Sequence, residues 1–178
     1  MKSFDELWAI VKEYRGWLDV LEARSLYRMS SYLGVSPIVE LGSYAGKSTS
    51  IIAHVVQSYD GKFITVDDFS TEDTREELKR NVERVGGKYE LLDMKSDDAV
   101  KLFQDESIEM LFIDTVHTYD AVKKDCDLWI PKVKKGFPIF FHDYCSKYEG
   151  VKMAVDERLG KDLNMLGVDY SLAHTYKL

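Results

Sequence analysis

The sequence is poor in cysteine, in proline and in long hydrophobic runs. Its 178 residues include only two cysteines, Cys126 and Cys145, and three prolines. Two cysteines at this separation supply neither a zinc-finger pattern nor an adequate disulfide framework, which favours a reducing compartment. No apolar run approaches the roughly 18 residues that span a bilayer, and the early carboxylates at the N-terminus are not typical of a signal peptide. We therefore expect a cytoplasmic protein with no membrane partner.

Positive charge is scarcer than negative charge. The chain has 24 Lys and Arg against 31 Asp and Glu, which gives a formal net charge of -7 at pH 7. Such a balance disfavours nonspecific binding to nucleic acid or to anionic membranes. The length fits one domain that buries about two-thirds of its unfolded surface. We expect a single domain over residues 1–178, with a helical cap at 1–36 and an α/β core at 37–178.

Apolar residues recur at helical spacing within the cap. The stripe has spacings of three and four and consists of Phe4, Leu7, Val11, Tyr14, Leu18 and Leu21. A second helix is expected over residues 21–33 and ends at Gly34. The stripe can pack against the sheet or against a second copy of the chain, which leaves a homodimer open. A lid over a substrate is the third alternative.

From residue 37 onward, strand-like and helix-like segments alternate about five times. The pattern predicts strands at 37–41, 62–67, 89–92, 108–114 and 136–143, and two short strands within 163–178. It predicts helices at 47–58, 71–85, 96–103, 118–130 and 150–159, with Thr71 and Ser96 as N-caps. Repeated βα units imply a mostly parallel, Rossmann-like sheet with helices on both faces. The expected fold is α/β, with a helical N-terminal cap and a short C-terminal β-hairpin.

The turn after the first predicted strand is the most informative segment. Glu40 ends an apolar run, and Gly42 and Gly46 follow it before a helix begins. Glycines let the backbone approach a ligand, and the new helix presents free N–H groups. Asp67 ends the next strand roughly 20 residues later, as in a dinucleotide-type fingerprint. A phosphate loop is excluded because only three residues separate the two glycines, where that motif needs four.

Polar residues follow every strand of the predicted parallel sheet. Ligands bind outside the carboxyl ends of such strands, so these side chains share one rim. They are Glu40 and Gly42, then Asp67 and Asp68, then residues 93–96, then residues 114–117, and finally His142 and Asp143. Asp114 and Asp143 end adjacent predicted strands, about 5 Å apart. Together with an imidazole, two such carboxylates can hold an oxygen-preferring divalent cation.

The motifs at these positions resemble a known family. They are residues 40–49 (ELGSYAGKST), 66–68 (VDD), 112–119 (FIDTVHTY), 124–129 (KDCDLW), 141–143 (FHD) and 150–156 (GVKMAVD). Together they resemble class I S-adenosylmethionine-dependent methyltransferases. More closely, they resemble the small group related to the cephalosporin-hydroxylase-like and macrolide-sugar O-methyltransferases. The similarity covers roughly residues 37–160, and the combination of motifs is more specific than any one of them.

The resemblance implies roles for individual residues. The methionine end of the cofactor is expected at Glu40, Gly42, Ser43 and Gly46, the ribose at Asp67 and the adenine at Ser96. A divalent cation, Mg²⁺ or Mn²⁺, is expected at Asp114, His142 and Asp143. The related enzymes often have Glu or Asn where this chain has His142. The expected catalytic residues are Asp114, which orients the acceptor through the cation, and His117, which takes its proton.

The leading hypothesis is methyl transfer from S-adenosylmethionine to an oxygen of a small molecule, assisted by a divalent cation. One alternative is a metal-free methyltransferase in which His117 or His142 is the base. Another is a methyltransferase-like protein that binds the cofactor without catalysis. A dehydrogenase is disfavoured, because the third glycine of its fingerprint is missing and the rim carboxylates would repel a second phosphate.

Overall fold

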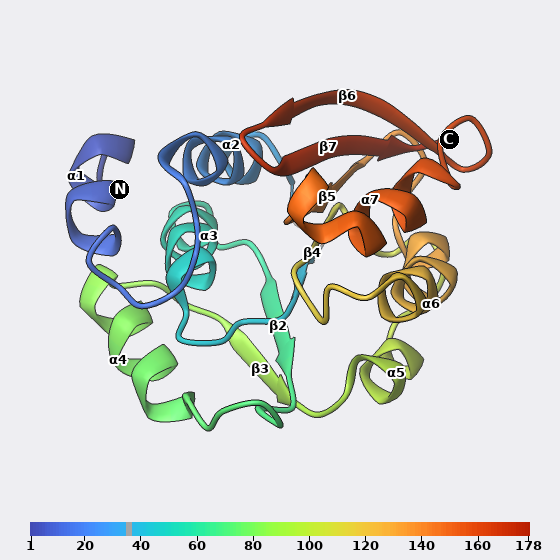
Figure 1. Cartoon of the computed structure of the whole chain (residues 1–178). Coiled ribbons are helices and arrows are strands. Elements are labelled where there is room, and N and C mark those ends of the chain that lie inside the picture. Colours follow the sequence, from blue (N-terminus) through green and yellow to red (C-terminus); the bar gives the residue numbers. More distant parts are fainter. Residues whose placement is uncertain (35–36) are drawn as a thin grey trace.

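A seven-stranded sheet runs through the middle of the computed structural model, which describes residues 1–34 and 37–178 (Figure 1). The strands lie in the order β3-β2-β1-β4-β5-β7-β6. Their bounds are β1 Ile38–Leu41, β2 Phe63–Asp67, β3 Glu90–Asp93, β4 Met110–Ile113, β5 Pro138–Phe141, β6 Leu163–Asp169 and β7 Leu172–Lys177. The first five strands pair in parallel, while β7 is antiparallel to β5 and to β6. The predicted parallel sheet and C-terminal hairpin are confirmed.

The strand order reverses beside β1, which pairs with β2 on one side and β4 on the other. At such a switch point the loops leaving the two neighbouring strands diverge and open a crevice. The turn after β1 contains the predicted site residues Gly42, Ser43 and Gly46, the loop after β4 contains Asp114 and His117, and Asp67 is the last residue of β2. The crevice therefore opens beside the turn after β1 and the loop after β4.

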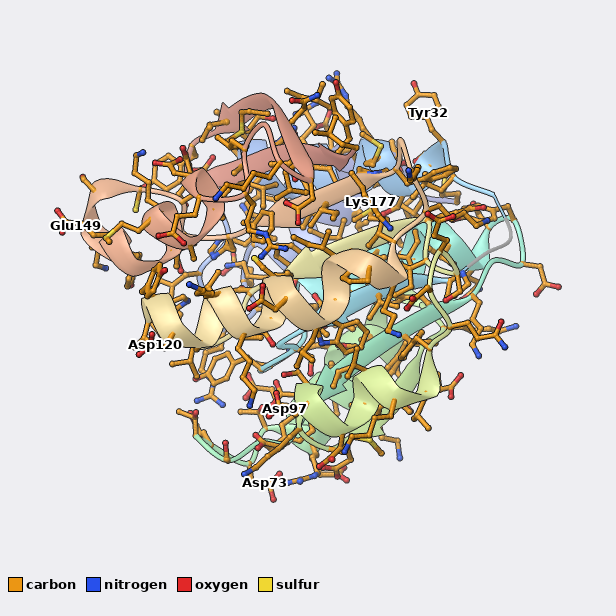
Figure 2. The ribbon with its side chains drawn as sticks, turned by 90° about the vertical axis from the view of Figure 1, so that its right-hand side faces the viewer. Tyr32, Asp73, Asp97, Asp120, Glu149 and Lys177 are labelled. Carbon is orange, nitrogen blue, oxygen red and sulfur yellow. The ribbon has the colours of Figure 1, made fainter. Side chains whose placement is uncertain are left out.

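Helices cover both faces of the sheet (Figure 1). One face carries α1 Phe4–Val11, α2 Val20–Ser31, α3 Lys47–Gln57 and α4 Arg75–Val85; the other carries α5 Ser96–Ala99, α6 Tyr119–Trp129 and α7 Glu149–Asp156. Three short 3-10 turns, η1 Val100–Leu102, η2 Ile130–Lys132 and η3 Ser146–Tyr148, connect these elements. Figure 2 faces the second layer, with Asp97 near the start of α5 and Asp120 near the start of α6.

Strand alternation divides the core into two clusters. Ile38 on β1 packs with the α1–α4 layer, whereas Val39 and Leu41 pack with the α5–α7 layer. The side chains of residues two apart on a strand share a face. Glu40 must therefore point toward the α1–α4 layer, beneath α3.

The N-terminal cap packs onto the sheet. The stripe is buried in the α1–α4 cluster from Phe4 to Leu18. Leu21 is 51% exposed, so its predicted place in the stripe is wrong. The reason is that Asp19 caps a new helix at Val20 and resets the helical phase, after a bend at Gly16 with φ 120°. Within the described residues, no helix is long and apolar enough to cross a membrane.

Two predicted helix caps are wrong. The N-cap of α4 is Thr74 rather than Thr71, and its hydroxyl donates to the carbonyl of Tyr44 at 2.7 Å. Ser96 is the first residue of α5 and not its cap, because its hydroxyl donates to Asp125 at 2.9 Å. The helix predicted through Phe103 ends at Ala99 and continues as the η1 turn. The hydroxyls of Thr74 and Ser96 thus both donate to tertiary acceptors and not to the local backbone.

Candidate active site

A cleft of about 1430 Å³ opens at the carboxyl ends of the parallel strands. Most of the predicted site residues line it, namely Gly42, Ser43, Asp67, Ser96, Asp114, His117, His142 and Asp143. Glu40 and Gly46 are not among its lining residues. The walls also include residues 15–19 between α1 and α2, and Tyr170 and Ser171 between β6 and β7.

The turn between β1 and α3 is shaped by close approaches to other elements. Gly42 has φ 90°, and a β-carbon there would lie 1.9 Å from the carbonyl oxygen of Asp114. Gly46 has φ 83°, and its β-carbon would lie 2.6 Å from Leu78 Cδ1 on α4. Gly46 thus serves the packing of α3 on α4, while Gly42 brings the turn against the end of β4.

The structure corrects the prediction for Glu40. Its side chain is fully buried under α3 and accepts hydrogen bonds from three hydroxyls, those of Ser48 (2.5 Å), Thr49 (2.6 Å) and Thr65 (2.8 Å). Burial raises its pKa to about 7, against the opposing effect of those three donors. Glu40 therefore lies behind the glycine turn, where it holds the first turn of α3 and does not line the cleft.

Asp67 ties the end of β2 to the glycine turn. Its Oδ2 accepts the backbone N–H groups of Ser43 and Tyr44, both at 2.9 Å, and its Oδ1 accepts the N–H of Phe69 at 2.8 Å. The Ser43 hydroxyl also donates to Oδ2, at 3.3 Å, whereas Oδ1 accepts only the one N–H, so Oδ1 is the oxygen with capacity for a ligand hydroxyl. Asp68 also lines the cleft and accepts from Ser70 N at 3.0 Å.

Ser96 is held by a buried carboxylate that sequence reasoning missed. Asp125 on α6 accepts from Ser96 Oγ at 2.9 Å and from Thr115 Oγ1 at 2.7 Å. Burial raises the pKa of Asp125 despite these two donors. The carboxylate thereby connects the start of α5 to the loop after β4, and these two segments form one wall of the cleft.

Two carboxylates and two imidazoles meet where β4 and β5 end. His117 Nε2 lies 3.5 Å from Asp114 Oδ1 and 3.0 Å from Asp143 Oδ2. His142 Nδ1 lies 3.4 Å and 3.2 Å from the same two oxygens. These four atoms, each of which could donate a lone pair to a metal ion, alternate O, N, O, N around a ring. We call them the donor ring. Among the described residues, Asp114, His117 and Asp143 also form a set whose ligand atoms all lie within 4.8 Å of one another.

The ring nitrogens are close to the carboxylates without hydrogen-bond alignment. His117 Nε2 and His142 Nδ1 are two of the four buried side-chain polar atoms that lack a hydrogen-bond partner in the described part of the chain. Nitrogens that face two carboxylate oxygens in this way suit either shared protons or a common cation. The sequence predicted Asp114, His142 and Asp143 as ligands, and the structure adds His117 to the same cluster.

The charges of the cluster perturb one another. Asp114 and Asp143 raise the pKa of His117 to about 10. Burial alone lowers the pKa of His142, but Asp114, Asp143 and Glu22 outweigh it and raise that pKa well above its usual range. Burial raises the pKa of Asp143, yet both imidazoles hold it well below its ordinary value. Without another cation, the cluster is close to self-neutralised.

Glu22 is the second site residue that sequence reasoning missed. It is 1% exposed on α2 and lies 3.1 Å from His142 Nε2 through its Oε2 atom. Its Oε1 accepts from Ser171 N at 3.0 Å and Ser171 Oγ at 2.7 Å. The local sequence suggests only a helix-capping box with Asp19, which is also present. That local role concealed the long-range contact.

Exposed aromatic and apolar side chains surround the mouth of the cleft. Trp17 is 83% exposed, Tyr170 is 75% exposed and Val116 is 61% exposed. The Tyr148 ring lies 4.6 Å from the His117 ring, centroid to centroid. Apolar surface held next to a polar cluster is typical of a small-molecule site.

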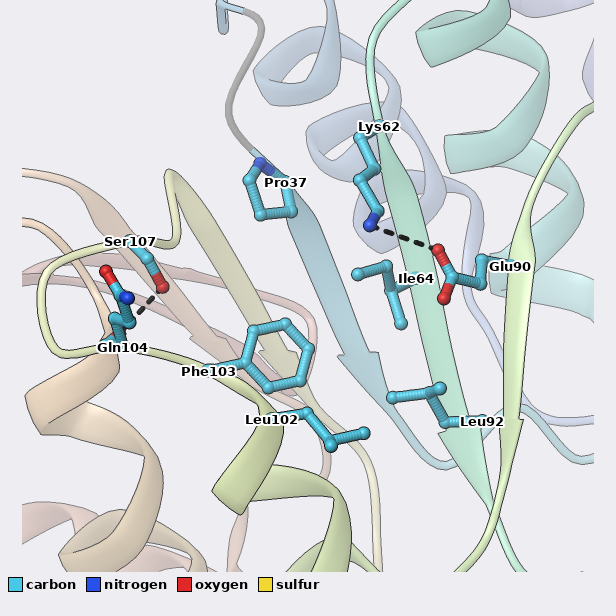
Figure 3. A pocket seen from close by; sticks show the side chains of 9 residues that line it. All are labelled: Pro37, Lys62, Ile64, Glu90, Leu92, Leu102, Phe103, Gln104 and Ser107. Carbon is cyan, nitrogen blue, oxygen red and sulfur yellow. Dashed lines mark hydrogen bonds and ion pairs between the residues drawn. The ribbon is translucent and has the colours of Figure 1, made fainter.

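A second hollow of about 430 Å³ lies away from this cleft (Figure 3). Pro37 and Lys62, which precede β1 and β2, are at its edge, and Lys62 forms an ion pair with Glu90 at 3.1 Å. The opposite ends of the strands bear the donor ring. This hollow brings together no comparable set of titratable side chains among the described residues, so the large cleft is the candidate active site.

Comparison with known proteins gives matches to a family model and to solved structures. A family model described as "Methyltransferase domain" matches residues 39–144. That range begins in β1 and ends just after Asp143, so it includes the glycine turn, Asp67 and the donor ring.

Solved structures of O-methyltransferases have the same fold. The O-methyltransferase NovP superposes with a TM-score of 0.75 at 16% identity, covering 90% of this chain and 81% of that one. The O-methyltransferase from Bacillus cereus in complex with SAH gives 0.73 at 14% identity, covering 98% and 90%. The TDP-rhamnose 3'-O-methyltransferase of calicheamicin biosynthesis gives 0.66 at 18% identity, covering 88% and 77%.

Proposed function

This chain belongs to the methyltransferase-domain family and is an S-adenosylmethionine-dependent methyltransferase; we propose that it methylates a hydroxyl oxygen of a small molecule with the help of a divalent cation. The observation that carries the proposal is the donor ring, which lies in the same cleft as the glycine turn. Gly42 lies directly against the backbone of Asp114, so the cofactor turn and the ring are neighbours.

The cofactor half of the cleft is formed by the turn after β1 and the ends of β2 and β3. Backbone N–H groups at the start of α3 can receive the carboxylate of the methionine moiety. The remaining acceptor capacity of Asp67 suits ribose hydroxyls, and residues 94–97 suit the adenine. When bound, the cofactor supplies the methyl group as an electrophile on a sulfonium.

The reacting oxygen needs a position in line with the methyl group and a route for its proton. Transfer forms a carbon–oxygen bond and breaks a carbon–sulfur bond, while the hydroxyl loses its proton. His117 lines the cleft with its side chain 37% exposed, although its Nε2 is buried against the two carboxylates, and its imidazole can take that proton. The chain contributes mainly alignment, which lowers the entropic part of the barrier.

The donor ring fits a divalent cation. Its neighbouring donors are 3.0–3.5 Å apart, and adjacent ligands of a small divalent cation are separated by about 3 Å. Two of its atoms are buried nitrogens without a hydrogen-bond partner in the described residues. Asp114, Asp143 and an imidazole would hold the cation, which would supply Lewis acidity that lowers the pKa of the acceptor hydroxyl.

The alternatives have less support. In a metal-free enzyme the base must be unprotonated, yet the unscreened carboxylates raise the pKa of His117 to about 10. His142 is 5% exposed, its Nε2 lies against Glu22 and its Nδ1 lies between the two carboxylates, so neither ring nitrogen is free to take a substrate proton. A binding protein without catalysis would have no need of the donor ring beside the cofactor turn.

The test is methyl transfer from labelled S-adenosylmethionine to a panel of catechols, sugars and hydroxylated metabolites, with and without a chelator. We expect transfer to at least one oxygen acceptor, inhibition by the chelator and recovery on adding Mg²⁺ or Mn²⁺. Transfer to a nitrogen or a carbon would overturn the oxygen assignment. Transfer that is insensitive to the chelator would favour the metal-free alternative.

A further inference from the structure

We propose that Glu22 is a positioning residue that makes His142, rather than His117, the nitrogen ligand of the cation, and that the site therefore prefers a cation that accepts imidazole over Mg²⁺. This inference rests on the proposed function, because it refines the same cation site. It concerns a residue from the N-terminal cap, about 120 positions from its partner in the chain.

The two ring nitrogens of His142 have different surroundings. Nε2 lies 3.1 Å from Glu22 Oε2, and Nδ1 lies between Asp114 Oδ1 and Asp143 Oδ2 at 3.4 and 3.2 Å. An ionised carboxylate only accepts hydrogen bonds, so Glu22 fixes the proton on Nε2. Nδ1 is then the nitrogen that faces both carboxylates, and a cation bound between them would displace the Nδ1 proton and take its lone pair.

Metal-binding histidines almost always donate their other ring N–H to a carboxylate, a carbonyl or a water. His142 meets this condition through Glu22. His117 has no carboxylate partner for its second ring nitrogen among the described residues; its ring faces Tyr148 and the cleft instead. The two histidines therefore differ in role: His142 binds the cation and His117 remains available to the substrate proton.

Glu22 is held too firmly to be a chance neighbour. It is 1% exposed, and its second oxygen accepts two hydrogen bonds from Ser171 in the β6–β7 turn. It also accepts from the backbone N–H of Asp19 at 2.8 Å. A buried carboxylate with four partners keeps one orientation, and through it the cap and the C-terminal hairpin set the tilt of the imidazole.

The nitrogen ligand has a consequence for the choice of cation. Carboxylate and water ligands suit Mg²⁺, whereas imidazole suits Fe²⁺, Co²⁺, Ni²⁺ and Zn²⁺. A site built from Asp114, Asp143 and His142 has a mixed donor set. We therefore expect the site to bind Fe²⁺, Co²⁺, Ni²⁺ or Zn²⁺ most tightly and Mg²⁺ most weakly, with an intermediate affinity for Mn²⁺.

The experiment measures cation binding directly, on the full chain. Co²⁺ and Mg²⁺ are titrated calorimetrically into the wild type, Glu22→Gln, Ser171→Ala and His142→Asn. Glu22→Gln should weaken Co²⁺ binding about 10–100-fold, the usual effect of removing such a partner. Ser171→Ala removes a hydroxyl from Glu22 but leaves the contact with His142, so Co²⁺ affinity should stay within about twofold. His142→Asn should lower the ratio of Co²⁺ to Mg²⁺ affinity at least about tenfold.

A spectroscopic measurement covers the case in which Glu22→Gln fails to fold. Pulsed EPR of Mn²⁺ bound to protein containing ¹⁵N-labelled histidine should show one imidazole coupling that His142→Asn removes and His117→Asn retains. Loss of the coupling in His117→Asn instead would overturn the proposal, as would equal weakening by Glu22→Gln and Ser171→Ala.

Binding of S-adenosylhomocysteine to the same samples separates the two levels of inference. If the wild type binds it and methylates an oxygen acceptor while Glu22→Gln leaves Co²⁺ affinity unchanged, the role of Glu22 is refuted and the proposed function stands. If the wild type does not bind it, the proposed function fails, and the cation titrations still decide the role of Glu22.

Discussion

Gly42 lies so close to the end of β4 that a β-carbon on it would be 1.9 Å from the carbonyl oxygen of Asp114. The two residues belong to different predicted functions, the first to cofactor binding and the second to the donor ring. Their backbones are in contact, so any movement of the turn also moves the ring. Under the proposed function, this backbone contact would help to set the distance between the cofactor and the acceptor.

Gly42→Ala should therefore disrupt the site and the fold together. The added methyl meets backbone atoms, and φ of 90° is strained for alanine, so we expect about 2–5 kcal/mol of destabilisation in urea unfolding. Gly86→Ala is the matched control, since Gly86 has φ 71° with no atom within 4 Å of its β-carbon. Gly86→Ala should lower the unfolding free energy by only about 1–2 kcal/mol. Equal losses would refute the close contact.

Asp67→Ala should weaken binding of S-adenosylhomocysteine more than Asp68→Ala. Asp67 holds the N–H groups of Ser43 and Tyr44, and its loss removes both this support and an acceptor for the ribose, which predicts a loss of about 1–3 kcal/mol. For the wild type, ligand at 100 times its dissociation constant should add about 2.7 kcal/mol of stability. Calorimetry and thermal unfolding measure both effects. A larger loss for Asp68→Ala would reverse the assignment.

Tryptophan fluorescence should report ligand binding through one residue. Of the three tryptophans, Trp129 is fully buried, Trp8 lies in the α1–α4 cluster, and Trp17 lines the cleft with 83% exposure. We expect S-adenosylhomocysteine to change the emission of the wild type, and Trp17→Phe to lose the change while still binding by calorimetry. A signal that persists in Trp17→Phe and disappears in Trp8→Phe would contradict this placement.

The sequence predicted the fold well because its signals are local and repeated. Strand and helix periods alternate along the chain, and each strand ends in polar residues, so the rule for parallel sheets collected Asp67, Ser96, Asp114, His117 and Asp143 into one cleft. The cap at Ser96 failed because its hydroxyl donates to Asp125 on another helix, and the helix predicted from Thr71 begins instead after Thr74.

The site was less predictable where a side chain's direction or a distant partner decides its role. Glu40 was placed on the rim, yet strand alternation turns it beneath α3 toward the hydroxyls of Ser48 and Thr49. Glu22 was missed because its local pattern is fully explained by the cap of α2. Contact with His142 depends on how the cap packs on the sheet, and no local pattern encodes that packing.

Glu40 should make stability depend on pH. Its pKa is raised from 4.5 to about 7 by burial, so folding favours the neutral carboxyl. A raised folded pKa contributes stability that is complete below about pH 4.5 and is lost as the pH rises through about 7. The difference in unfolding free energy between the wild type and Glu40→Gln should therefore fall by about 3 kcal/mol over this window. Urea unfolding at several pH values measures this difference. If the unfolding free energies of the wild type and Glu40→Gln depended on pH in the same way, burial would not raise the pKa of Glu40.

The carboxylates of the donor ring provide the last prediction. In Asp114→Asn and in Asp143→Asn, adding or removing divalent cations should no longer change the rate of methyl transfer. The reason is that each substitution removes a charged ligand from the ring. Binding of S-adenosylhomocysteine should be nearly unchanged, since the turn and Asp67 remain. Each change also leaves a buried His142 with one carboxylate fewer, so unfolding must be measured to confirm that the variants are folded at the assay temperature. Variants that stay folded, bind the cofactor and retain full cation-dependent transfer would place the cation elsewhere in the cleft.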